Sequence, residues 1–113
     1  MKTLGIALMF LTEITVNANI PQTGIASWYD KENKISSSGK RLCRNSPALA
    51  HRTLPMGTWV KITDTKTRKS VVAVVEDRGP YIHGRIVDLN KSAAKQLGIL
   101  KSGVAKVSVE KLK

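Results

Sequence analysis

Short apolar runs, each ended by turn-forming residues, constrain the fold of this 113-residue chain most strongly. Residues 58–63 and 104–110 alternate between apolar and polar side chains, as strands with one buried face do. Residues 70–76 (SVVAVVE) are apolar almost throughout, which predicts a strand buried on both faces, as inside a barrel. Runs this short and this frequent predict a mainly β domain and favour a small barrel.

Further short elements complete this pattern. Residues 24–29 and 85–88 are predicted as strands, and residues 64–69 as a polar hairpin connection. Residues 30–47 are rich in Lys, Ser, Gly and Asn, which predicts a long loop. Residues 48–51 are too few to assign.

One short helix is predicted after the fourth of these strands. Asp88 or Asn90 can cap its N-terminus, and Gly98 fits the position that ends a helix. Apolar residues at helical spacing lie between these limits: Ala93, Ala94 and Leu97.

The first segment, residues 1–18, predicts export. Lys2 precedes a short apolar run at 4–11, and Val16 and Ala18 place small residues at the −3 and −1 positions of a cleavage site after Ala18. The run is shorter than the roughly 20 apolar residues that span a bilayer, so we expect no stable membrane insertion. The alternative is a buried N-terminal helix.

The predicted organisation is a signal peptide at 1–18, a linker at 19–23 and one domain at 24–113, soluble and monomeric in the periplasm or outside the cell. The net charge of +11 survives cleavage and favours an anionic partner. Export argues against nucleic acid and points to cell-wall polymers or membrane surfaces; the alternative is that the charge serves solubility alone. The single cysteine, Cys43, cannot form an internal disulfide. No pattern for a metal or another cofactor is present.

Three segments resemble, in order and spacing, the rare lipoprotein A-like family. They are GIASWY at 24–29, AHRTLPMGT at 50–58, and DRGPY at 77–81, which continues as HGRIVDL at 83–89. The resemblance covers roughly residues 24–110. It implies a six-stranded double-psi β-barrel with one short helix, and glycan strands of peptidoglycan as the substrate. Some members are lytic transglycosylases.

Asp77 is the leading candidate for the general acid. A lytic transglycosylase needs few groups, because a hydroxyl of the sugar itself is the nucleophile. Asp77 follows the 70–76 run directly and matches the family's Asp-Arg-Gly-Pro motif; the alternative is that it only orders a turn. Glu76 should face the opposite way on the strand, which makes a poor pair. His51, in the matching 50–58 segment, is the second catalytic candidate.

Arg78, Trp28 and Tyr81 are candidates for substrate binding. Arg78 can pair with Asp77 or with substrate carboxylates, or it can be a structural partner of Asp88. The rings of Trp28 and Tyr81 can stack on sugar faces. Two further aromatic residues stay undecided between core and site: Tyr29 and Trp59.

The chain departs from the family's pattern in the loop at 36–44. Catalytic members carry a Glu, and an Asp three residues later, where this chain has Lys40 and Cys43. A lysine is a poor proton donor at neutral pH, so Lys40 and Arg41 are predicted to grip an anionic part of the substrate. Cys43 is either a tolerated replacement or a reactive thiol among cations. The preferred hypothesis is a transglycosylase with Asp77 as sole acid; the alternative is a non-catalytic, expansin-like wall-binding module.

Overall fold

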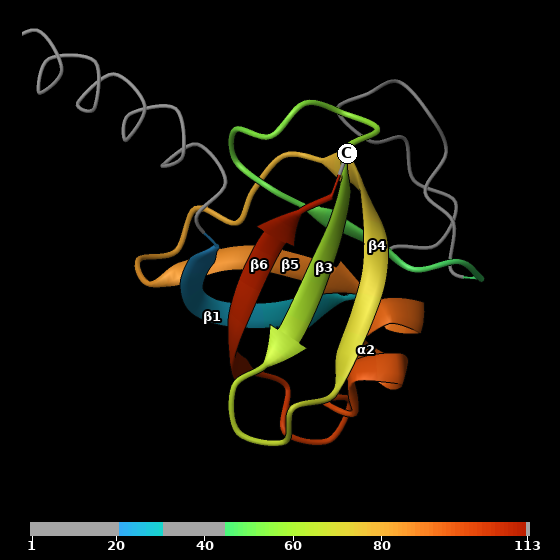
Figure 1. Cartoon of the computed structure of the whole chain (residues 1–113), viewed down its shortest axis with the longest axis vertical. Coiled ribbons are helices and arrows are strands. Elements are labelled where there is room, and N and C mark those ends of the chain that lie inside the picture. The colour runs from blue at the N-terminus through green and yellow to red at the C-terminus, as the bar shows by residue number, and fades with distance from the viewer. Residues whose placement is uncertain (1–20, 31–44, 113) are drawn as a thin grey trace, which may run out of the picture.

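The computed structural model describes residues 21–30 and 45–112. Within these ranges, six strands close into a barrel and one short helix packs against it (Figure 1), as the resemblance implies. The elements in chain order are β1 (Gln22–Tyr29), β2 (Ala48–Ala50), β3 (Trp59–Asp64), β4 (Ser70–Asp77), β5 (Arg85–Asn90), α2 (Lys91–Leu97) and β6 (Ala105–Lys111).

The strand order around the barrel is β1-β5-β2-β4-β3-β6. β1 runs parallel to β5, and β2 runs parallel to β4, whereas the other neighbours are antiparallel. The short strand β2 therefore lies between β5 and β4, which are distant from it in sequence. This arrangement brings residues near the ends of β2, β4 and β5 together.

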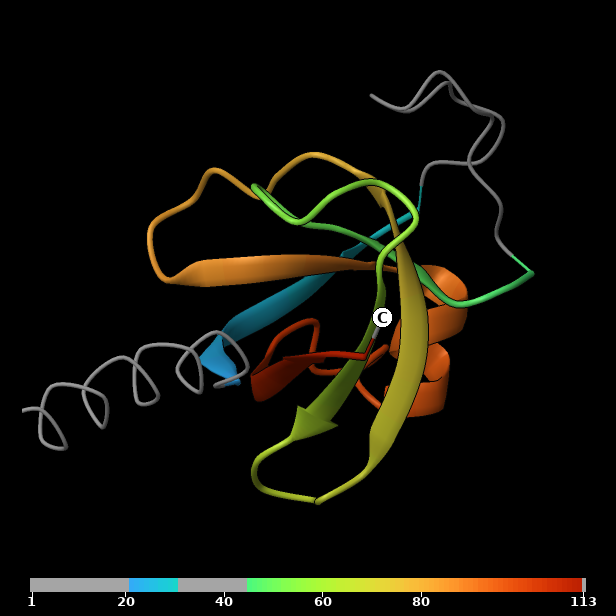
Figure 2. The same ribbon diagram turned by 45° about the horizontal axis from the view of Figure 1, so that its top comes forward.

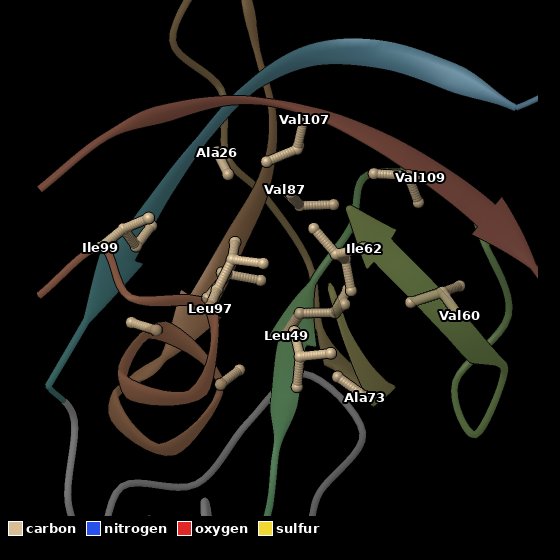
Figure 3. Close-up of a cluster of buried hydrophobic side chains, with 14 of the residues drawn as sticks. Ala26, Leu49, Val60, Ile62, Ala73, Val87, Leu97, Ile99, Val107 and Val109 are labelled. Atoms are coloured by element: carbon tan, nitrogen blue, oxygen red, sulfur yellow. The ribbon is translucent and has the colours of Figure 1, made fainter. Parts of the chain in front are cut away.

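Apolar side chains from the strands fill the barrel (Figure 3), and Val60, Ile62 and Val107 are fully buried there. The prediction that residues 70–76 are buried on both faces is wrong. Val71 is buried, but its neighbour Val72 is 45% exposed. In a closed barrel this small only every second side chain reaches the interior, and nothing in the described chain covers the outer face of β4 at this point.

Most strand positions are confirmed to within one or two residues. β1 begins at Gln22, so Gln22 and Thr23, which were expected in the linker, pair with β6. β5 continues to Asn90, two residues further than predicted. The strand at 48–50 was not assigned from the sequence, because three residues carry too little periodicity.

Helix α2 begins and ends where local chemistry predicts. Asn90 is the N-cap, and its side chain accepts a hydrogen bond from the N–H of Ala93. Gly98 has φ of 84°, and its N–H bonds to the carbonyls of Ala94 and Lys95. Figure 2 shows the helix beside β4, where its buried face joins the core.

The predicted signal peptide and most of the long loop at 30–47 lie outside the described residues. No helix in the part of the chain that the structure describes is long and apolar enough to cross a membrane.

Candidate functional site

The centre of the site is a row of residues across β1, β5, β2 and β4. Ser27 lies opposite Asp88, Asp88 lies opposite Ala50, and Ala50 lies opposite Asp77. The hydroxyl of Ser27 donates to Oδ1 of Asp88 at 2.9 Å. A single alanine on β2 therefore separates the two aspartates, which are eleven positions apart in the chain.

Tyr29, at the end of β1, contacts a third carboxylate beside this row, that of Glu76. Its hydroxyl donates to Oε2 of Glu76 at 2.7 Å, and only 9% of Tyr29 is exposed. Burial raises the pKa of Tyr29 well above its ordinary value, and the hydrogen bond to Glu76 and the charges of Glu76, Asp88 and Asp77 raise it further. The hydroxyl of Tyr29 therefore stays protonated and donates its hydrogen bond to Glu76. We call Tyr29, Glu76, Asp77 and Asp88 the carboxylate cluster.

Asp77 lies at the end of β4, where the chain turns. Its Oδ1 accepts the N–H of Arg78 at 2.9 Å, and its backbone carbonyl accepts the N–H of His51 at 3.0 Å. Asp77 therefore helps to order the turn, as the alternative interpretation predicts.

His51 is buried beside Asp77 and is held at both ring nitrogens. Nδ1 accepts the N–H groups of Thr53 and Leu54, each at 3.1 Å, and Nε2 lies 3.1 Å from Oε1 of Gln22. Because Nδ1 is an acceptor, Nε2 carries the proton and donates to Gln22. Burial, and then the charges of Arg52 and Arg78, lower the pKa of His51, which keeps the ring neutral.

Arg78 connects the turn to the loop that follows His51. Its Nη1 donates to the carbonyl of Leu54 at 2.7 Å and to that of His51 at 3.1 Å. The two bonds hold residues 51–54 against the end of β4. These contacts of Arg78 are therefore structural and are made to backbone carbonyls. The sequence suggested only carboxylate partners for this side chain.

The predicted aromatic and cationic contacts are spread more widely. Tyr81 is 75% exposed in the loop after Asp77, where its ring is free to meet a ligand. Trp28 is partly buried and packs against the barrel core, while Trp59 is 49% exposed on β3. Lys40 and Arg41, like Cys43, lie outside the described residues.

The sequence interpretation underrated Tyr29 and Glu76. Ser27 and Tyr29 are two residues apart on one strand, so they share a face, and that spacing was an available signal. The contact between Tyr29 and Glu76 joins residues 47 positions apart, and no local pattern predicts it. Among residues 21–30 and 45–112, no three His, Cys, Asp or Glu side chains are placed to hold a metal ion.

A closed barrel of six strands in the order β1-β5-β2-β4-β3-β6 defines the class of this protein, a double-psi β-barrel. The fold matches the Streptomyces papain inhibitor with a TM-score of 0.68 at 18% identity, over 82% of this chain and 94% of that one. It also matches a Clavibacter michiganensis expansin with a TM-score of 0.68 at 18% identity, over 83% of this chain and 51% of that one.

Sequence comparison gives the family. The model of the lytic transglycolase family matches residues 21–109, and the chain belongs to that family. It is 42% identical over 97 residues to an endolytic peptidoglycan transglycosylase RlpA of Neisseria meningitidis serogroup A, covering 84% of this chain and 41% of the relative. A probable endolytic peptidoglycan transglycosylase RlpA of Synechocystis is 44% identical over 89 residues, 77% of this chain and 28% of the relative. The chain thus spans less than half the length of these relatives.

Proposed function

We propose that this protein is exported and cleaves the glycan strands of peptidoglycan as an endolytic transglycosylase, with Asp77 as the general acid. The observation that carries the proposal is the position of Asp77 in the carboxylate cluster at the end of the barrel. The family of the chain supports the reaction class, and the relatives named as peptidoglycan transglycosylases support the substrate.

The reaction needs a proton that is held at neutral pH and released to an oxygen. Carboxylates that share one site repel each other as anions, which favours a protonated member. Tyr29 cannot supply this proton, because its raised pKa keeps its hydroxyl neutral and donating to Glu76. Asp77 lies at the end of β4, before a loop whose residues 81–84 are exposed, and is the member of the cluster that we assign to the substrate.

In the proposed step, Asp77 gives its proton to the glycosidic oxygen as the bond to the anomeric carbon breaks. A hydroxyl of the same sugar attacks that carbon and closes an anhydro ring. The carboxylate of Asp77 then takes the proton of that hydroxyl, so the acid is restored and no water is consumed.

His51 and Arg78 enter this proposal as positioning residues. Both nitrogens of His51 are engaged, so the ring offers no free lone pair to a substrate proton. The ring instead fixes the backbone at Thr53 and Leu54, and Arg78 ties that segment to the strand end beside Asp77. Tyr81, Trp28, Lys40 and Arg41 stay proposed contacts for the sugar chain and its anionic groups.

The decisive experiment compares the wild type with Asp77→Asn on purified, peptide-free glycan strands, with products detected by mass spectrometry. Loss of a general acid lowers the rate by about 100-fold or more. An asparagine oxygen can still accept the N–H of Arg78, so the turn should form. Glu110→Gln is the matched control, because Glu110 is exposed on β6 and lies outside the cluster. A wild type that releases no anhydro products, or an Asp77→Asn variant as fast as the control, would refute the proposal.

A non-catalytic wall-binding module is the second candidate, favoured by Lys40 and Cys43 at positions where the family's catalytic members carry acids. It predicts that the wild type sediments with insoluble peptidoglycan, more weakly as salt rises, and releases no product.

A further inference from the structure

Six exposed cations gather at the end of the barrel that lies away from the carboxylate cluster. They come from the β3–β4 hairpin, the last turn of α2, the turn that follows it and the start of β6. In Figure 1 the hairpin and this turn lie at the lower end, and the β2–β3 loop beside the site lies at the upper end. We call this set the basic pole: Lys66, Arg68, Lys69, Lys95, Lys101 and Lys106.

Hydrogen bonds and packing hold these segments together. The N–H and the hydroxyl of Thr65 both donate to the carbonyl of Lys106, at 3.0 and 3.1 Å. A Cβ added to Gly98 would lie 3.3 Å from Nζ of Lys69, so this ammonium group reaches the C-terminal end of α2. The negative end of a helix dipole stabilises a cation there.

Carboxylates are nearly absent from this end of the described chain. Asp64 lies in the hairpin but is only 6% exposed, and its Oδ1 accepts the N–H groups of Lys66 and Thr67. The other described carboxylates belong to other segments: Asp30, Glu76, Asp77, Asp88 and Glu110. The basic pole therefore has one buried carboxylate among its cations, whereas the other end has carboxylates together with Arg52 and Arg78. Strand β4, eight residues long, separates the two ends by about 23 Å.

We propose that the basic pole docks the protein on an anionic phospholipid bilayer. Its cations are mostly lysines on protruding turns, which suits the many mobile phosphates of a membrane surface better than one fixed ligand. Val104, in the same turn region, is 43% exposed and adds an apolar contact. Docking by this end leaves Asp77 directed away from the membrane.

The test is vesicle sedimentation of the protein without residues 1–18, the form that the proposed export would produce. The vesicles contain about 30% phosphatidylglycerol in phosphatidylcholine, or phosphatidylcholine alone, at about 0.05 M salt and again at about 0.5 M. The pole variant is Lys66→Gln, Arg68→Asn and Lys69→Gln, with Asn at 68 because φ there is 69°. The matched control is Lys61→Gln, Lys91→Gln and Lys111→Gln, which removes the same charge from outside the pole.

Each Lys or Arg near an anionic bilayer strengthens binding about five-fold, so the pole variant should bind about 100-fold more weakly at low salt. The control variant should change by less than about five-fold, and high salt should abolish the difference. Equal losses in the two variants, or a wild type that binds both vesicle types alike, would overturn the proposal. So would a pole variant that loses binding to purified peptidoglycan while vesicle binding is unchanged. Cleavage of soluble glycan by the pole variant reports separately on the Asp77 site.

Discussion

Replacing Asn90 with alanine tests how the short strand β2 and the helix α2 are held in register with the rest of the barrel. Asn90 is 2% exposed, and its Oδ1 accepts the N–H groups of both Ala93 and Ala48, at 2.9 and 3.1 Å. Its Nδ2 donates to the carbonyl of Ser46 at 2.7 Å. The side chain of Asn90 thus caps α2 and also holds the start of β2, which lies 42 positions earlier in the chain.

The cost of Asn90→Ala follows from these partners. Loss of an N-cap costs about 1 kcal/mol. The buried N–H of Ala48 loses this acceptor, which costs about 2 kcal/mol more. The carbonyl of Ser46 belongs to an exposed residue, so water can replace Nδ2. The free energy of unfolding should therefore fall by about 3 kcal/mol in total.

Urea unfolding followed by circular dichroism measures this loss, and the melting temperature should fall by on the order of 15 °C. Asn90→Ser separates the two contributions, because serine keeps the cap but is too short to reach Ala48 as well. It should lose about 2 kcal/mol. A loss below about 1 kcal/mol in Asn90→Ala, or equal losses in both variants, would contradict this account of β2.

Two further stability predictions follow from the site and from the core. The pKa of His51 is lowered from 6.5, so the folded state prefers the neutral ring; the stabilisation is complete above pH 6.5 and is lost as the pH falls through the lower, folded-state pKa. Urea midpoints between about pH 8 and pH 5 should show this decline, and a His51→Gln variant with the same slope would count against it. In Gly24→Ala, the new Cβ would lie 2.7 Å from Cγ2 of Ile86, which should cost about 1 to 3 kcal/mol. An Ile86→Ala background should remove that cost, and a cost that persists there would show that the clash is not its cause.

The local elements of this protein were predictable because their signals lie within a few residues. The strand at 59–64 and the cap at Gly98 follow from alternation and from backbone conformations that glycine favours. The prediction that the run at 70–76 is buried on both faces fails because apolar composition does not show whether another layer covers each face of a strand. Val72 is exposed because the barrel encloses only one face of β4.

The candidate site was predictable only in part. The motif around Asp77 predicts that the turn after β4 belongs to the site, and the segment 50–58 predicts the same for His51. The roles of their neighbours were not visible, because Tyr29 meets Glu76 and Arg78 meets Leu54 across 47 and 24 positions of sequence. Such contacts depend on which strands become neighbours.

The sequence by itself determined the strand periodicities, the ends of the helix and the excess of positive charge, because each depends on residue type and short spacing. Only the tertiary structure decided that β2 enters between β5 and β4, which places Ala50 between Asp88 and Asp77. It also placed the carboxylate cluster at one end of the barrel and the six cations of the basic pole at the other. The physical reason is that many strand pairings have similar local stability. The pairing that forms is the one that buries all the inward-facing apolar side chains together.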